Sequence, residues 1–227
     1  MSILASPWIM VGLDVLMVLY SFWAVSTQKG LQRPAPAIAA FLALWLAGLH
    51  IGLSRQAIFA PDISGPAFLA VILAAVALVG ALLLLVGPVR RLLLALDQRR
   101  LLLLQGVRVF FGASFLMMAA IDALPRGFGI LDGFTHVGAG FFGLIAAFAL
   151  ADGVDGRRRA WFANLFGLAD ILVVASSLAL LLLPQIGPHH NMMYAVFLPA
   201  PLWLWFHLIS IWKLLHADGP GAAAGQS

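Results

Sequence analysis

Long apolar stretches, separated by short polar or proline-containing segments, make up most of the chain. A helix that crosses a bilayer needs about 20 mostly apolar residues, and seven stretches have this character. They cover residues 7–25, 35–54, 66–87, 101–122, 132–151, 161–183 and 192–215. The pattern predicts an all-α membrane protein, with one seven-span domain over residues 1–218. The small, polar segment 219–227 is expected to be a disordered tail.

Composition supports the membrane class and narrows the chemistry. Of the 227 residues, 63% are hydrophobic and 10% are charged, against about 45–50% and about 25% in soluble domains. Most of the positive charges fall in the predicted loops, which favours the lipid bilayer as partner and argues against nucleic acid. There is no cysteine, so disulfides, thiolate metal sites and cysteine nucleophiles are excluded.

The loop charges predict an orientation. The first stretch has no positive charge before it and is followed by Lys29 and Arg33, which is the wrong polarity for a cleaved signal peptide. With the N-terminus outside, the inner segments hold ten basic residues: Lys29, Arg33, Arg90, Arg91, Arg99, Arg100, Arg157, Arg158, Arg159 and Lys213. The outer segments hold only Arg55 and Arg126. This bias predicts a multi-pass inner-membrane protein with a cytoplasmic C-terminus.

Ionisable and polar residues within the apolar stretches are the candidate functional groups, because such groups are costly in lipid and usually pair, line a cavity or do chemistry. We sort them by span direction. The outer group is Asp14, His50, Asp122, Asp132 and His136, and the inner group is Gln105, Arg108, Asn164, Asp170 and His207. Arg108 needs a counter-charge at its own depth, and this predicts an Arg108–Asp170 pair completed by Asn164 and His207. The pair can be structural or functional.

The histidines allow several interpretations. His50 and His136 lie at similar predicted depth, so they could ligate a haem or a metal, with Asp132 orienting His136. No stretch carries the paired histidines of stacked b-type haems, so we predict no cofactor and no metal site, and keep haem as the alternative. His189 and His190 are expected to be solvated loop residues. His207 can exchange protons near neutral pH or serve as a packed core residue.

Small residues and prolines predict how the helices pack. Ala139, Gly143, Ala147 and Ala151 repeat every four residues, a spacing that lets helices approach closely. We expect this face to pack inside the bundle rather than between copies, while a homo-oligomer or larger membrane complex remains open. Pro199 and Pro201 predict a kink or break in the last stretch, because each removes a helix hydrogen bond.

Several short motifs carry a resemblance. They are Arg108 followed by Gly112, Leu124-Pro125, Asp132-Gly133, Asn164, Gly167-Leu168-Ala169-Asp170, Pro199 to Leu202, and His207. In these positions, about half the chain resembles a loose group of uncharacterised bacterial multi-pass membrane proteins. The resemblance implies a bacterial inner-membrane location and brings no activity. It adds weight to Arg108, Asp132, Asn164, Asp170 and His207 as one linked set.

Three functions follow as hypotheses. The first is a proton-coupled transporter or a channel for a small solute or ion. Its pathway would use Arg108, Asn164, Asp170, His207, Asp132 and His136. The second is a non-catalytic accessory, assembly or sensor protein in which these residues hold helices together. The third is a haem or quinone redox protein using His50 and His136. An opsin is disfavoured because Lys213 lies at the end of its span, and no hydrolase, protease or ATPase motif supports an enzyme.

Overall fold

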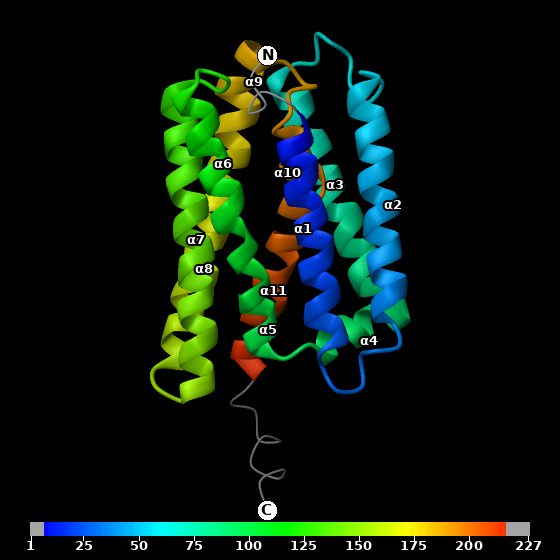
Figure 1. Ribbon diagram of the computed structural model, residues 1–227, viewed down its shortest axis with the longest axis vertical. Helices are drawn as coiled ribbons and strands as arrows, with labels where there is room; N and C mark the ends of the chain where they lie inside the picture. Colours follow the sequence, from blue (N-terminus) through cyan, green and yellow to red (C-terminus); the bar gives the residue numbers. More distant parts are fainter. Residues whose placement is uncertain (1–6, 217–227) are drawn as a thin grey trace, which may run out of the picture.

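The structure is a computed structural model that describes residues 7–216, and every regular element in this range is a helix (Figure 1). The elements in chain order are α1 (Pro7–Ser26), α2 (Ala35–Ser54), α3 (Gly65–Leu85), α4 (Gly87–Ala95), α5 (Gln98–Leu103), the 3₁₀ turn η2 (Leu104–Val107), α6 (Arg108–Ala120), α7 (Arg126–Asp152), α8 (Gly156–Ser177), the π-helical turn η3 (Leu178–Leu182), α9 (Leu183–Ile186), α10 (Met193–Phe197) and α11 (Pro199–His216).

Six of these helical segments are long and apolar enough to cross a membrane. They are α1, α2, α3, the continuous run Gln98–Ala120, α7, and the run Gly156–Ile186. The all-α membrane fold predicted from the sequence is confirmed to this extent. The seventh predicted stretch is divided at Leu198 into α10 and α11, so the expected break at the prolines is present. The predicted tail 219–227 lies outside the described residues.

α11 occupies the centre of the bundle. It packs against α8 and α5 on one side and against α3 on the other. In Figure 1, α6, α7 and α8 lie on one side of the molecule, and α1, α2 and α3 lie on the other. α7 packs between α6 and α8, and α1 packs between α2 and α6. One face of α11, including His207 and Ser210, is therefore buried in protein, and this face can carry polar groups away from lipid.

Glycines allow α7 to approach α5 and α6 closely. A Cβ atom at Gly140 would lie 2.9 Å from the backbone nitrogen of Val109, and one at Gly143 would lie 3.0 Å from the carbonyl oxygen of Leu102. Ala139 and Ala147 of the same repeat are fully buried, whereas Ala151 is exposed. The small-residue face of α7 thus packs within the bundle, as predicted.

Basic residues tie the segments at one end of the bundle together, the lower end in Figure 1. Arg100 donates to the carbonyl oxygen of Ala24 at 2.7 Å, and Lys213 donates to the carbonyl oxygens of Leu94 and Leu96, each at 2.6 Å. These bonds join the end of α1, the α4–α5 connection and the end of α11. The basic residues Arg90 and Arg91 lie in the short helix α4.

Candidate functional site

Arg108, the first residue of α6, is the centre of a buried polar network. Its side chain is completely buried and forms an ion pair with Asp170 of α8. Its Nη1 atom donates to Nε2 of His207 at 3.1 Å, and its guanidinium lies 5.1 Å from the centroid of the Trp203 ring. The predicted Arg108–Asp170 pair is therefore formed, and His207 joins it as expected. A cation over an indole face adds further stabilisation.

From His207, a chain of hydrogen bonds continues toward the basic end of the bundle. Because Arg108 donates to Nε2, the other ring nitrogen, Nδ1, donates to Oδ1 of Asn164 at 2.9 Å. The amide of Asn164 donates to Oγ of Ser210 at 2.6 Å, and the amide of Gln98 also donates to that oxygen. Gln98 is the first residue of α5. The chain thus links the middle of the bundle to its basic end.

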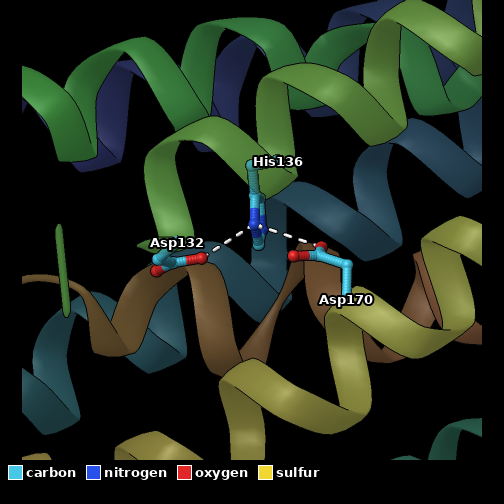
Figure 2. Close-up of side chains that lie close together, drawn as sticks. All are labelled: Asp132, His136 and Asp170. Atoms are coloured by element: carbon cyan, nitrogen blue, oxygen red, sulfur yellow. Dashed lines mark ion pairs between the residues drawn. The ribbon is translucent and has the colours of Figure 1, made fainter. Parts of the chain in front are cut away.

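On the other side of Arg108, the network continues through two acids and a histidine. In Figure 2 the ring of His136 lies between the carboxylates of Asp132 and Asp170. The Nδ1 atom of His136 is 2.8 Å from Oδ1 of Asp132 and 3.3 Å from Oδ2 of Asp170. All three residues are buried, and their potential metal-ligand atoms lie within 4.8 Å of one another. Asp170 belongs to both halves of the network.

This arrangement corrects the sorting of polar residues by depth. Asp132 and His136 were expected to open a span near the outer surface, apart from Arg108 and Asp170. The helix instead begins at Arg126, so Asp132 lies six residues inside it, about 9 Å along its axis. Pro125 precedes the helix, and the glycines that follow it resemble a loop in sequence. Two of the predicted outer residues therefore belong to the inner cluster.

A small cavity adjoins the cluster. Its volume is about 50 Å³, and Asp132 and His136 form the charged part of its wall. The remaining wall residues are apolar and come from α3, α6, α8, η3, α10 and α11: Ile72, Val76, Phe115, Ile171, Val174, Ala175, Leu178, Met192, Ala195, Val196, Ala200 and Pro201. A water molecule needs roughly 10–15 Å³ of such space. The cavity can therefore hold a few waters or a small hydrated ion beside the carboxylates.

Irregular backbone surrounds this site. The 3₁₀ turn η2 comes directly before Arg108, the π-helical turn η3 provides Leu178 to the cavity wall, and the break at Leu198 separates the two halves that provide Ala195 and Ala200. Departures from α-helical winding within helices often mark functional positions. In this molecule they adjoin the polar network or its cavity.

The remaining predicted residues have other partners. Nδ1 of His50 lies 2.7 Å from the hydroxyl of Tyr194, and the His50 ring lies 5.3 Å from the Trp8 ring at a tilted angle, whereas His136 contacts Asp132 and Asp170. The two histidines considered as haem ligands thus have separate surroundings, and haem stays the alternative to the predicted absence of a cofactor. Asp14 is completely buried, and its carboxylate has no hydrogen-bond partner among the described residues.

His189 and His190 are half-buried rather than solvated, which corrects the expectation for this loop. Nε2 of His190 donates to the carbonyl oxygen of Ala123 at 3.1 Å, and its Nδ1 accepts from the backbone nitrogen of Met192. The ring therefore joins the ends of α6 and α10. Burial lowers the pKa of His190, and the hydrogen bond to Ala123 opposes this effect.

Sequence reasoning missed Ser210 and Gln98. The available signal for Ser210 was its spacing, because it lies three residues after His207 and so shares its face of α11. Gln98 gave no comparable signal, since it lies in a charged segment that reads as a loop. Both residues lie at the end of the network that approaches the basic surface.

Comparison with known proteins places the chain in a family. Residues 66–215 match the family model described as a domain of unknown function, DUF8737. This range covers well over half of the 227 residues, so the chain belongs to that family. It contains every residue of the polar network and leaves α1 and α2 outside. No curated protein and no solved structure matches the chain.

Proposed function

We propose that this member of the family is a membrane transporter that carries a small cation through the interior of its helix bundle. The observation that carries the proposal is the buried network itself. It contains two carboxylates, Asp132 and Asp170, against one permanent cation, Arg108. A buried charge is retained only with a partner, and intramembrane ionisable groups commonly mark ion pathways. The second carboxylate is balanced by His136 only while this ring carries a proton, which favours a proton, or a cation that replaces it, as the transported species.

The position of the network supports a pathway. On one side of Asp132 and His136 lies the cavity of about 50 Å³. On the other side, the polar groups continue through Arg108 and His207 to Ser210 and Gln98 at the basic end. Together they form a route of hydratable groups through a bundle whose other interior residues are mostly apolar. A purely structural ion pair has no need of the cavity or of the extended chain.

The broken segment α10–α11 supplies a candidate moving part. Discontinuous helices in transporters form ion sites near mid-membrane, and rearrangement around the break gives alternating access. In this protein the break at Leu198 lies between two groups of cavity-wall residues, Ala195 and Val196 before it and Ala200 and Pro201 after it. A change of angle at Leu198 would open or close the cavity beside Asp132.

We further propose seven crossings in an inner membrane, with the N-terminus outside and α10–α11 as the last crossing. The basic residues gathered at one end of the bundle support this orientation. A reporter that is active only in the cytoplasm, fused after residue 227, is expected to be active. A reporter active only in the periplasm is expected to be silent there, and the opposite pattern would reverse the orientation and the path direction.

Reconstitution tests the transport proposal directly. Purified protein is placed in liposomes, and the entry of protons, monovalent and divalent cations is followed with trapped fluorescent indicators. We expect flux of at least one cation, strongly reduced by Asp132→Asn and unchanged by Asp122→Asn, since the Asp122 side chain is 80% exposed at the bundle surface. Liposomes that pass none of these ions, with protein correctly folded and inserted, would contradict the proposal.

A second function has one observation in its favour. The side chains of Arg108 and Asp170 are 0% and 1% exposed, so this pair is as enclosed as a structural element of an accessory protein would be. In that case the network fixes the packing of α6, α8 and α11 and moves no ion. The double substitution described in the Discussion separates the two functions.

A further inference from the structure

We propose that Asp132, His136 and Asp170 form a binding site for a divalent transition-metal cation of the Zn²⁺ or Mn²⁺ class. The inference deepens the proposed function, on which it rests, by naming the class of cation. It concerns the three residues drawn in Figure 2, two from neighbouring turns of α7 and one from α8. Each provides one ligand atom to a common centre.

The spacing of the ligand atoms suits a single ion. Nitrogen and oxygen ligands lie about 2.0–2.2 Å from a bound Zn²⁺, so two ligands at angles of 90–110° are about 2.8–3.6 Å apart. Nδ1 of His136 is 2.8 Å from Oδ1 of Asp132 and 3.3 Å from Oδ2 of Asp170. All three ligand atoms lie within 4.8 Å of one another. Only small side-chain movements would bring them around one ion.

Asp132 is a buried carboxylate whose partner among the described residues is the His136 ring. It is 1% exposed, and apart from its ion-pair contact with His136, neither of its oxygens accepts a hydrogen bond from the described residues. Figure 2 shows its carboxylate directed at the His136 ring and the common centre. His136 compensates this buried carboxylate only while the ring carries a proton, and a buried charge without a partner is costly. A metal cation at this centre could take the place of that proton.

The charge of the network also leaves room for a cation. Arg108 pairs with Asp170, and Asp132 pairs with His136, whose positive charge depends on a bound proton that a metal ion could replace. Arg108 contacts Asp170 through Nη2, so it also fixes the orientation of that carboxylate. It would act as a positioning residue, since partners of metal ligands hold their geometry.

The donor set selects the class of ion. One imidazole nitrogen with two carboxylate oxygens suits Zn²⁺, Mn²⁺, Co²⁺ and Fe²⁺, whereas Ca²⁺ and Mg²⁺ prefer oxygen alone and Cu⁺ prefers sulfur ligands. Three protein ligands leave a coordination position open. Asp132 and His136 line the cavity of about 50 Å³, so that position can be filled by water and reached by an incoming ion.

Metal binding is tested on the full-length protein purified through a tag without histidines and stripped with a chelator. Zn²⁺ and Mn²⁺ are titrated by calorimetry, with Mg²⁺ and Ca²⁺ for comparison. We expect one Zn²⁺ or Mn²⁺ per chain, and binding about tenfold or more weaker in Asp132→Asn and His136→Gln. Asp14→Asn is the matched control, because it makes the same change at another fully buried acid and should bind like the parent.

X-ray absorption of the Zn²⁺-loaded parent protein keeps the test valid if a variant fails to fold. The expected first shell is one imidazole nitrogen and two carboxylate oxygens, completed by water oxygen. No binding by the parent, equal binding by folded Asp132→Asn, or a shell of several imidazoles would overturn the metal site. If the parent binds no metal but its liposomes conduct protons or monovalent cations, the transport proposal stands alone. If metal binds and no ion crosses, the site stands and the transport proposal fails.

Discussion

α2 and the run α5–η2–α6 have similar lengths, 20 and 23 residues, and similar apolar character, but they occupy different environments. In the most apolar part of α2, 22% of residues are buried, against 67% in Gln98–Ala120. α2 packs mainly on α1, and an apolar hollow of about 510 Å³ separates it from α3. The second run lies among α1, α7 and α11 and provides Gln105 and Arg108 to the network.

The difference shows what hydropathy leaves undetermined. Both segments read as spans, and nothing in their overall apolar content tells which one faces lipid. The polar residues distinguish them, because Arg108 can be accommodated only where Asp170 and His207 meet it. The family match agrees with this division, since it covers the second run and excludes α2. The family match therefore includes the segments that carry the polar network and leaves out the mainly exposed α2.

The largest expected effect concerns the ion pair. Removing one partner of a buried pair strands the other charge, at a cost of roughly 3–5 kcal/mol. Arg108→Ala and Asp170→Ala should therefore each lower the thermal stability of the detergent-solubilised protein sharply, and the double substitution should recover much of the loss. The same cycle on Asp122 and Arg126, whose side chains are 80% and 68% exposed, should change the melting temperature little.

Activity of the double variant then distinguishes the two proposed functions. A stable double variant that retains its cellular role would make the pair structural. A stable variant without ion flux would make it part of the pathway. Losses that simply add would mean that the two side chains do not interact, contrary to the structure.

A smaller effect is expected from glycine substitutions in the two regions. A Cβ atom at Gly167 of α8 would collide with Nε2 of His207 and lie 3.2 Å from Nη1 of Arg108. Gly167→Ala should cost about 1–3 kcal/mol through overpacking and reduce flux by displacing His207. At Gly48 of α2, nothing lies within 4 Å of the added atom, so Gly48→Ala should gain up to about 1 kcal/mol of helix propensity. The measurement is the free energy of unfolding of each variant. Equal changes at Gly167 and Gly48 would show that the two regions do not differ in packing.

The smallest expected effect concerns His190, which lies in the loop between α9 and α10. Its pKa is lowered by burial, so the unfolded chain binds more protons than the folded one as the pH falls below about 6.5. Stability should therefore decrease on acidification from that point, with a slope set by the extra proton. His190→Gln should remove this part of the pH dependence. An unchanged slope would show that His190 is not buried in the folded protein.

The sequence was sufficient to predict the Arg108–Asp170 contact, because few groups can neutralise a charge at a given depth in lipid. It was also sufficient for the break near Pro199 and for the internal packing of the α7 glycines, since both follow from local backbone constraints. The position of Asp132 was not predictable in the same way. Hydropathy marks where a helix enters lipid, and α7 extends beyond that boundary to Arg126.

The hydrogen bonds that connect Ser210 and Gln98 to the network could not be predicted from the sequence either. Serine is common in spanning helices, and its partners depend on which face each helix presents. The face that each helix turns toward its neighbours depends on packing among α5, α8 and α11. This packing cannot be inferred from one segment of the sequence. The metal-type arrangement of Asp132, His136 and Asp170 depends on the same packing of α7 against α8.

The π-helical turn η3 has a consequence for insertions and deletions. A π-helical turn holds one residue more than the α-helix needs, so the run Gly156–Ile186 carries a built-in insertion at residues 178–182. Deleting one exposed residue there, such as Leu181, would remove the extra residue, so α-helical winding would continue and the segments on either side would keep their faces. Leu178 would keep its place beside Asp132 and His136, and the span would shorten by only about 1.5 Å. A single-codon deletion at this turn should therefore be tolerated, whereas the same deletion within the regular helix α2 would rotate everything after it by about 100°.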